Sequence, residues 1–210
     1  MKIYDVANFP NPARVRIALA EKNATDKVTF IPVDVMAGEH RQAAFLAKNP
    51  AAGVPVLELD DGICIAECSA ISEYIDHAFD GPSLTGQSPT ERAVINMLMR
   101  RAEFMVLDAV GAYFHHATDG LGPELETHQN AAWGNQQKQT ALNGMMYFNQ
   151  LLEDNAKQKK HYVAGNEFSV ADITLFAGLA FADFAGVAVP DNCDQLLAWQ
   201  SSTASRPSVA

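Results

Sequence analysis

The chain has 210 residues, 48% of them hydrophobic, with a formal net charge of −10 and three cysteines. This length allows one large domain or two small ones with an ample core, and no apolar run approaches the roughly 20 residues that span a membrane. The negative charge argues against nucleic acid and anionic membranes as partners. The few cysteines and the absence of a secretory signal at the start favour a reducing, cytoplasmic compartment.

The first part of the chain predicts alternating strands and helices. The predicted elements are strands at 2–5 and 28–33 and helices at 12–22 and 45–48. Asn11 is the expected N-cap of the first helix, because its side chain can accept a hydrogen bond from a free backbone N–H. Pro12 suits the first helical position, where its missing N–H costs nothing.

Residues 53–74 predict two short strands followed by a helix. Asp61-Gly62 lies between β-branched apolar runs and indicates a hairpin, because the turn needs a positive φ that glycine supplies. Val54-Pro55 opens the first strand, a position that tolerates proline. These elements predict a thioredoxin-like α/β domain with a mixed four-stranded sheet, and the turn-forming residues 80–88 indicate a linker.

Beyond Pro89 the hydrophobic periodicity is helical and predicts an all-helical C-terminal bundle. One apolar stripe follows the first long helix: Val94, Leu98, Ala102, Met105, Ala109 and Tyr113. A break at 117–123 precedes a second long helix, expected at 124–154. Ser169 and Asp172 form a capping box, and the apolar helix that follows is expected to be the buried centre of this part. A last helix is expected at 194–203.

Three motifs, in order along the chain, carry a resemblance to a known family. They are Arg14-Val15-Arg16-Ile17-Ala18-Leu19, then Val54-Pro55 with Glu67-Cys68-Ser69-Ala70-Ile71, and Phe168-Ser169-Val170-Ala171-Asp172-Ile173-Thr174. Nearly the whole chain resembles the cytosolic glutathione transferases. The resemblance implies a thioredoxin-like glutathione-binding domain at 1–79, a linker at 80–88 and a helical domain at 89–210. It also implies a homodimer that uses glutathione as co-substrate, needs no metal, and conjugates the glutathione thiolate to small hydrophobic electrophiles.

The resemblance also assigns glutathione-binding residues. The Val54–Pro55 bond is expected to be cis, with the Val54 backbone meeting the cysteinyl part of the tripeptide. Glu67 and Cys68 hold the γ-glutamyl end at a helix start, where free N–H groups attract its carboxylate. The alternative is that Glu67 only complements the helix dipole. Cys68 replaces the family's usual Ser or Thr, so its backbone amide is expected to make the contact, with help from Ser69.

Two further features of the first domain leave alternatives open. His40 or Arg41 falls where the family's loop approaches the glycyl carboxylate, and a solvated loop is the alternative. Cys64 and Cys68 could form a redox pair, but their spacing is not Cys-x-x-Cys, and we favour structural thiols. No set of cysteines and histidines has the spacing of a zinc site.

The catalytic position departs from the family pattern. Family members place a Ser, Cys or Tyr between the first strand and the first helix, but residues 6–13 contain neither a hydroxyl nor a thiol. This segment is most similar to a yeast- and bacterial-type branch that lacks the usual catalytic side chain. The helix start at Asn11 then offers amide donors and a positive dipole end, which lower the pKa of a nearby thiol. Tyr4 reads as a buried core residue, the alternative being a phenol turned towards the glutathione sulfur.

His115 and His116 end the first long helix, which in this family overhangs the glutathione sulfur. An imidazole there could act as a general base, directly or through a water. We favour His115, which lies one turn after Gly111, where a side chain would not block access. The alternative is a surface histidine that stabilises a helix C-terminus.

Two other functions compete with a transferase. A glutathione-binding stress or scaffold protein without transferase activity would retain the fold, and the missing hydroxyl keeps this alternative open. A disulfide or dehydroascorbate reductase would need a cysteine before the first helix to form a mixed disulfide, and none lies there.

Overall fold

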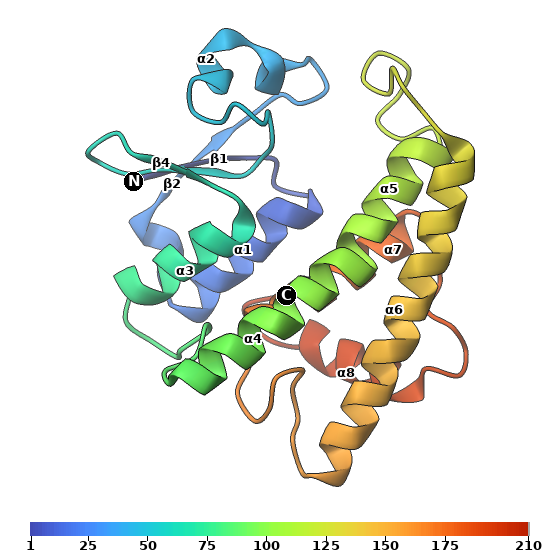
Figure 1. Ribbon diagram of the computed structural model, residues 1–210. Coiled ribbons are helices and arrows are strands. Elements are labelled where there is room, and N and C mark those ends of the chain that lie inside the picture. Colours follow the sequence, from blue (N-terminus) through green and yellow to red (C-terminus); the bar gives the residue numbers. More distant parts are fainter. Residues whose placement is uncertain (210) are drawn as a thin grey trace. The chain divides into compact units, whose positions relative to one another are not determined.

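The computed structural model describes residues 1–209. They form two compact units, which divide between Ser83 and Leu84. Figure 1 shows the strands and short helices of the first unit and the long helices of the second.

The first unit contains a mixed four-stranded sheet, as the sequence predicts. Its elements are β1 (Lys2–Asp5), α1 (Pro10–Glu21), η1 (Thr25–Lys27), β2 (Thr29–Pro32), η2 (Glu39–Arg41), α2 (Ala43–Leu46), β3 (Val56–Glu58), β4 (Cys64–Ala66) and α3 (Cys68–Ala78). The strand order is β2-β1-β3-β4, with β1 parallel to β2 and antiparallel to β3, and with β3 antiparallel to β4. In Figure 1, α1 and α3 lie together on one side of the sheet and α2 lies on the other. The thioredoxin-like prediction is confirmed.

The prediction for the start of α1 is wrong by two residues. The helix begins at Pro10, its N-cap is Phe9, and no side chain caps it. Asn11 is therefore inside the first turn rather than at the cap. The physical reason is that the first-turn N–H groups have no partner within the helix, so prolines at both 10 and 12 fit there and the sequence does not distinguish the two starts.

The hairpin between β3 and β4 turns at Asp60–Gly62. Leu59 N donates to Ile63 O at 2.8 Å, and Gly62 N donates to Leu59 O at 3.0 Å. Gly62 has a φ of 88°, so the predicted positive φ is confirmed. The loop has three residues, with the glycine at the left-handed position that such loops require.

Among its described residues, the second unit consists of helices and loops, with one isolated β-bridge between Tyr162 and Gly165. Its elements are α4 (Pro89–Ala102), η3 (Glu103–Leu107), α5 (Asp108–Ala117), α6 (Ala131–Lys157), α7 (Val170–Phe184) and α8 (Asp194–Ala204). The second long helix, expected from residue 124, begins only at Ala131. Asn130 is its N-cap, and the Asn130 Oδ1 accepts from Trp133 N at 3.0 Å. Residues 118–130 form a loop instead. Hydrogen bonds that involve polar side chains, such as those from Gln129 Nε2 to His115 O and from Asn130 N to His116 Nδ1, hold this loop to the end of α5.

A π-helical segment, η3, joins α4 to α5, so that the three elements form one continuous helix (Figure 1). Two glycines from distant parts of the chain pack against it. A Cβ added at Gly144 of α6 would lie 2.4 Å from Met105 O, and one added at Gly178 of α7 would lie 3.1 Å from Val106 Cγ1. Both helices therefore approach the π segment closely because these residues carry no side chain.

The helix α7 is the buried centre of the second unit, as predicted. Ser169 N donates to Asp172 Oδ2 at 3.1 Å, which confirms the capping box, and Val163 N donates to Asp172 Oδ1 at 2.8 Å. Burial raises the pKa of Asp172 to about 6, against the opposing effect of these hydrogen bonds. The carboxylate thus ties the segment before α7 to the helix start.

Candidate functional site

The segment before β3 presents unused backbone groups. The Val54–Pro55 peptide bond is cis, as predicted. The ladder of β3 begins at Val56, so Val54 lies outside it. Within residues 1–209 the Val54 N–H and C=O have no hydrogen-bond partner. An extended peptide could pair with this residue.

The side chain of Asn49 holds this segment through two hydrogen bonds. Its side chain is buried, and Nδ2 donates to Gly53 O at 2.8 Å while Oδ1 accepts from Ala51 N at 3.1 Å. Ala52 has a φ of 56°, a left-handed conformation that is uncommon for a residue with a Cβ. The two hydrogen bonds of Asn49 therefore fix the loop that delivers Val54.

The start of α3 has an unusual backbone. Glu67 is the N-cap, with φ 68° and ψ 123°. A non-glycine residue in such a conformation stores roughly 1–3 kcal/mol and is typical of ligand-binding sites. The Glu67 side chain is exposed, and its carboxylate has no partner among the described residues. Ser69 is half-buried in the first turn of α3.

Two residues predicted for the site meet between α1 and α3. Cys68 is buried, and its Sγ donates to Asn11 O at 3.3 Å and lies 3.7 Å from Asn11 Oδ1. Asn11 Oδ1 also accepts from Nη1 of the buried Arg14 at 3.0 Å. The Cys68 thiol thus joins the starts of the two helices. Cys64 lies in β4, and neither cysteine is in a disulfide.

His40 is buried, so its side chain does not lie in a solvated loop, which was the alternative to a role in binding. It lies in η2 with 9% of its surface exposed, and its Nδ1 is buried without a hydrogen-bond partner. Burial, and then the charge of the neighbouring Arg41, lower the pKa of His40. The imidazole is therefore favoured in its neutral form until an anion or a hydrogen-bond partner meets it.

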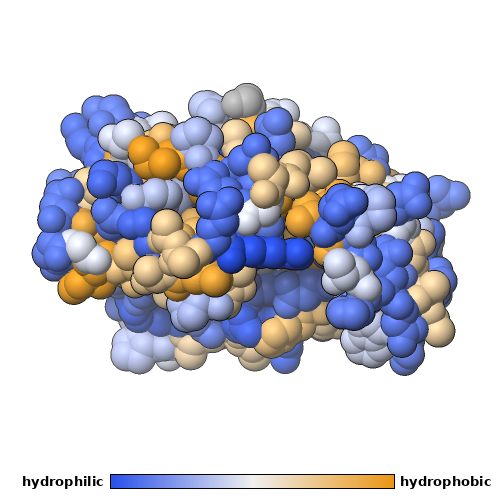
Figure 2. Space-filling model, turned by 90° about the horizontal axis from the view of Figure 1, so that it is seen from above, coloured by the Kyte–Doolittle hydropathy of each residue, from blue (hydrophilic) through white to orange (hydrophobic). Residues whose placement is uncertain are grey.

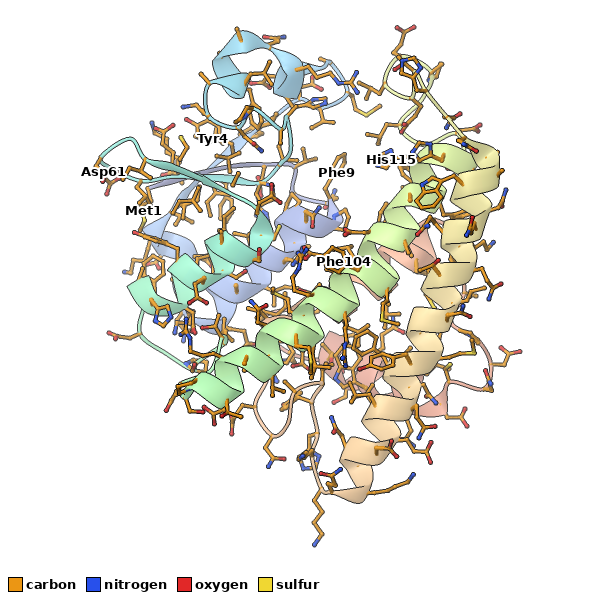
Figure 3. All side chains as sticks on the ribbon, in the orientation of Figure 1. Met1, Tyr4, Phe9, Asp61, Phe104 and His115 are labelled. Atoms are coloured by element: carbon orange, nitrogen blue, oxygen red, sulfur yellow. The ribbon has the colours of Figure 1, made fainter. Side chains whose placement is uncertain are left out.

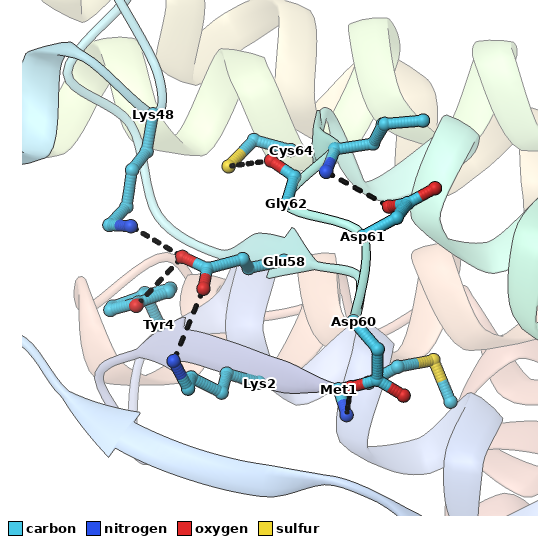
Figure 4. Close-up of polar contacts among 10 residues, drawn as sticks. Met1, Lys2, Tyr4, Lys48, Glu58, Asp60, Asp61, Gly62 and Cys64 are labelled. Carbon is cyan, nitrogen blue, oxygen red and sulfur yellow. Dashed lines mark hydrogen bonds and ion pairs between the residues drawn. The ribbon is translucent and has the colours of Figure 1, made fainter.

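Tyr4 is half-buried and is engaged in a charged cluster on the sheet (Figure 4). Its hydroxyl donates to Glu58 Oε2 at 2.9 Å, and Lys2 Nζ donates to Glu58 Oε1 at 3.2 Å. Lys48 also donates to Glu58, and its Nζ lies 4.8 Å from the centroid of the Tyr4 ring. The hydrogen bond from Lys48, followed by those from Tyr4 and Lys2, lowers the pKa of Glu58 to about 2. The phenol is thus a donor to a carboxylate.

In the second unit, two adjacent histidines end α5. Nδ1 of His115 lies 2.6 Å from Oε1 of Glu126, and Nδ1 of His116 accepts from Asn130 N at 3.1 Å. Figure 3 shows His115 at this end of the helix. Gln129 Nε2 donates to His115 O at 2.8 Å. Both imidazoles are therefore held by the loop between α5 and α6.

Aromatic rings gather along α5 and α7 of the same unit. Phe114 and Phe181 meet edge to face with centroids 5.4 Å apart, and Phe184 lies 5.8 Å from Phe114. Phe184 is 76% exposed, so these rings present an apolar surface to solvent. On the face shown in Figure 2, hydrophobic residues lie among hydrophilic ones.

Residues 1–77 match the family model of the glutathione S-transferase N-terminal domain, and residues 115–210 match that of the C-terminal domain. Glutathione S-transferase 2 of Saccharomyces cerevisiae is 54% identical over 210 residues, which cover 100% of this chain and 88% of that protein. The chain belongs to the glutathione S-transferase family. Glutathione is therefore its co-substrate, and conjugation of glutathione is its general reaction.

Solved structures of other glutathione S-transferases agree with this fold. A glutathione S-transferase domain-containing protein of Marinobacter aquaeolei is 62% identical with a TM-score of 0.96, and the match covers 100% of both chains. The Saccharomyces cerevisiae protein Gtt2 is 53% identical with a TM-score of 0.94, over 100% of this chain and 98% of that one. The likeness extends through both units.

Sequence reasoning missed several residues that shape this glutathione S-transferase. Asn49 had a visible signal, since an Asn-Pro pair after a short helix often opens a turn. Glu126 had none, because its contact with His115 is set by the path of the loop between α5 and α6. Among residues 1–209 no three His, Cys, Asp or Glu side chains are grouped to hold a metal, and no helix is long and apolar enough to cross a membrane.

Proposed function

We propose that this glutathione S-transferase conjugates the glutathione thiolate to small hydrophobic electrophiles. The observation that carries the proposal is the arrangement in the first unit, where the backbone of Val54 and the carboxylate of Glu67 have no partner within the described chain. Glutathione carries an ammonium group, two carboxylates and an extended backbone, and each of these has a complement there.

The binding roles follow from these complements. The Val54 N–H and C=O pair with the cysteinyl residue of glutathione, and Pro55 fixes the direction of the chain. Glu67 pairs with the ammonium group. The first-turn amides of α3, from Cys68 and Ser69, attract the γ-glutamyl carboxylate, as helix N-termini do for anions.

His40 binds the glycyl carboxylate in this proposal. Its buried Nδ1 lacks a hydrogen-bond partner in the described structure, and a buried polar atom in that position is stabilised when it gains one. An imidazole that takes up a proton as the carboxylate arrives would make this contact a charge-assisted hydrogen bond.

The thiolate forms without a hydroxyl or thiol from the enzyme. A free thiol has a pKa of about 8.5, so most glutathione is protonated at neutral pH. We place the chain in the yeast- and bacterial-type branch, in which the amides and dipole at the start of α1, near Asn11, stabilise the thiolate. We also assign to His115 of α5 the role of general base, directly or through a water.

The electrophile binds on the apolar surface of the second unit. The exposed ring of Phe184, with Phe114 and Phe181 beside it, offers aromatic faces and edges to a flat apolar molecule. This favours aromatic electrophiles among the small hydrophobic ones.

The localisation, oligomeric state, partners and domain bounds belong to the same proposal. The protein acts in the cytoplasm as a homodimer, with no nucleic acid or membrane partner, and its domains span 1–79 and 89–210 with a linker at 80–88. The net charge of −10 and three free cysteines support this assignment.

One alternative is favoured by a specific observation. Residues 6–13 contain no hydroxyl or thiol, which suits a glutathione-binding stress or scaffold protein without transferase activity. Two measurements on the same preparation separate the alternatives: calorimetry with glutathione, and turnover with a generic aryl halide. We expect binding and turnover together. Binding without turnover against a panel of aryl halides, epoxides and enals would favour the scaffold protein, and no binding would contradict both functions.

A further inference from the structure

The side chain of Asn11 ends in an amide whose oxygen is already engaged. Its Oδ1 accepts a hydrogen bond from Nη1 of Arg14 at 3.0 Å and lies 3.7 Å from Sγ of Cys68. A guanidinium group carries only donors, so the atom of the amide that faces Arg14 must be the oxygen. Because Arg14 is buried, this partner is held in place within α1. The orientation of the Asn11 amide is therefore set by the protein.

The nitrogen of the same amide is left available. Nδ2 of Asn11 has no hydrogen-bond partner within residues 1–209, and the residue is only half-buried. An amide NH2 group donates and cannot accept. The first turn of α1 thus presents a side-chain donor of fixed direction, in addition to the backbone N–H groups of the helix start.

The sheet register brings this donor to the position expected for the cysteinyl residue. Val56 of β3 pairs with Ala66 of β4 in antiparallel register. Val54 precedes this pair by two residues and Cys68 follows it by two, so both lie at the same end of the two strands. Sγ of Cys68 donates to Asn11 O at 3.3 Å, which places Asn11 at that end as well. The unused backbone groups of Val54 and the Asn11 amide therefore belong to one edge of the first unit.

We propose that Asn11 is a catalytic residue whose Nδ2 donates a hydrogen bond to the glutathione thiolate, and that Arg14 is the positioning residue that directs this donor. A cysteinyl side chain is short, so its sulfur stays close to the backbone that pairs with Val54. The inference rests on the proposed function and deepens it, because it names a side chain that stabilises the thiolate.

The amide transfers no proton in this role. The S–H bond of glutathione breaks, its proton leaves through water, and the electron pair stays on the sulfur, which then attacks the electrophile. A hydrogen bond to the charged form of an acid favours that form and lowers the pKa of the group. The amide itself does not titrate, so this stabilisation is available across the working pH range.

Nuclear magnetic resonance tests the contact directly. In ¹H–¹⁵N spectra of the full-length protein, the side-chain NH2 signal of Asn11 is assigned by its loss in Asn11→Asp. We expect this signal to shift when glutathione binds, and to move again with pH in step with the ultraviolet absorbance of the thiolate. S-methylglutathione has no thiol to ionise and should give no such pH-dependent step. A signal that does not follow thiolate formation would overturn the inference.

The variant Asn11→Ala tests the consequence for ionisation. We expect it to raise the apparent pKa of the bound glutathione thiol by about one unit and to lower turnover of an aryl halide near pH 7 about tenfold. Turnover should recover at a pH above the raised pKa, because the thiolate then forms without the amide. Asn23→Ala is the matched control, since it removes an exposed amide just beyond the other end of α1. A loss that persists at every pH with an unchanged thiol pKa would make Asn11 a structural residue and overturn the inference.

Two variants test the positioning role of Arg14. Arg14→Lys keeps a cation that only donates, so we expect the thiol pKa to stay close to that of the wild type. Arg14→Gln can donate or accept, so the Asn11 amide is free to turn, and its NH2 signal should no longer follow thiolate formation. A signal that still follows the thiolate in Arg14→Gln would contradict the positioning role of Arg14.

The outcomes separate this inference from the proposed function. A wild-type protein that does not bind glutathione, or binds it without turnover, would contradict the proposed function. A lowered thiol pKa that survives in Asn11→Ala, with turnover intact, would overturn only the inference and assign the stabilisation to the backbone amides of α1.

Discussion

The start of α3 presents mainly backbone groups, whereas the end of α5 presents side chains. At the start of α3, backbone groups and the unusual conformation of Glu67 create the opportunity for binding, and the dipole favours anions. At the end of α5, side chains make the contacts, and Nδ1 of His115 lies 2.6 Å from Oε1 of Glu126. Contacts made by backbone groups depend little on the side chain at a position such as Cys68, whereas contacts made by side chains depend on which residue is present.

The largest effect on the first region is expected from Glu67→Ala. A charge-assisted contact of about 1.5–3 kcal/mol corresponds to a roughly 10- to 150-fold rise in the glutathione dissociation constant. Calorimetry measures it. Glu73→Ala is the matched control, because it removes a half-buried carboxylate of the same helix, which pairs with His77 instead. An unchanged affinity in Glu67→Ala would reduce Glu67 to complementing the helix dipole.

We expect Gly144→Ala to destabilise the packing of the helices that support the end of α5. The Cβ of Gly144→Ala would meet Met105 O at 2.4 Å, so the helices must shift, at a cost of about 1–3 kcal/mol of unfolding free energy. Gly111→Ala is the control within α5, since its Cβ would meet Phe181 Cε1 at 3.6 Å, an ordinary contact. Chemical denaturation compares the two. Equal stability in both variants would mean that close packing at the π segment does not hold α5 in place.

A smaller effect is expected from Tyr4→Phe. The lost hydrogen bond to Glu58 contributes about 0.5–1.5 kcal/mol, and more if the carboxylate is left poorly satisfied, although Lys2 and Lys48 still contact it. Turnover should remain near that of the wild type, because the phenol is directed at Glu58. A collapse of turnover with an unchanged unfolding free energy would instead assign the phenol to catalysis.

The smallest effect is expected from Cys68→Ser. A serine hydroxyl can donate to Asn11 O as the thiol does at 3.3 Å, and the backbone amide is unchanged. Glutathione affinity should therefore stay within about threefold of the wild type, a free-energy difference below about 1 kcal/mol. A larger change in either direction would show that the side chain itself contacts the ligand.

Local signals explain which parts of the fold the sequence predicts. The Asp-Gly turn and the capping box at Ser169 and Asp172 are set by residues a few positions apart, and both are confirmed. The π segment has no such local signal, and Gly144 and Gly178 pack against it from distant helices. The late start of α6 has a similar cause, since residues 118–130 are held to the end of α5.

The residues of the candidate site fall into the same two groups, those with a local sequence signal and those whose contacts depend on the tertiary structure. Val54, Pro55 and Glu67 were identified from motifs, and the cis bond is confirmed. The contact between Asn11 and the thiol of Cys68 is long-range, because the two residues are 57 positions apart in sequence. The capping role expected for Asn11 failed because the helix starts at Pro10, and its side chain pairs with Arg14 instead. Glu126 and Asn130, which contact His115 and His116, could be identified only once the loop was in place.

The central claim is that this enzyme forms the glutathione thiolate without a hydroxyl or thiol of its own. The most direct test is the ultraviolet absorbance of the thiolate of bound glutathione, measured against pH in the wild type and in Tyr4→Phe. We predict an apparent thiol pKa below the free value of about 8.5 in both proteins, with no difference between them. A large upward shift of this pKa in Tyr4→Phe alone would contradict the account and assign the thiolate to the tyrosine.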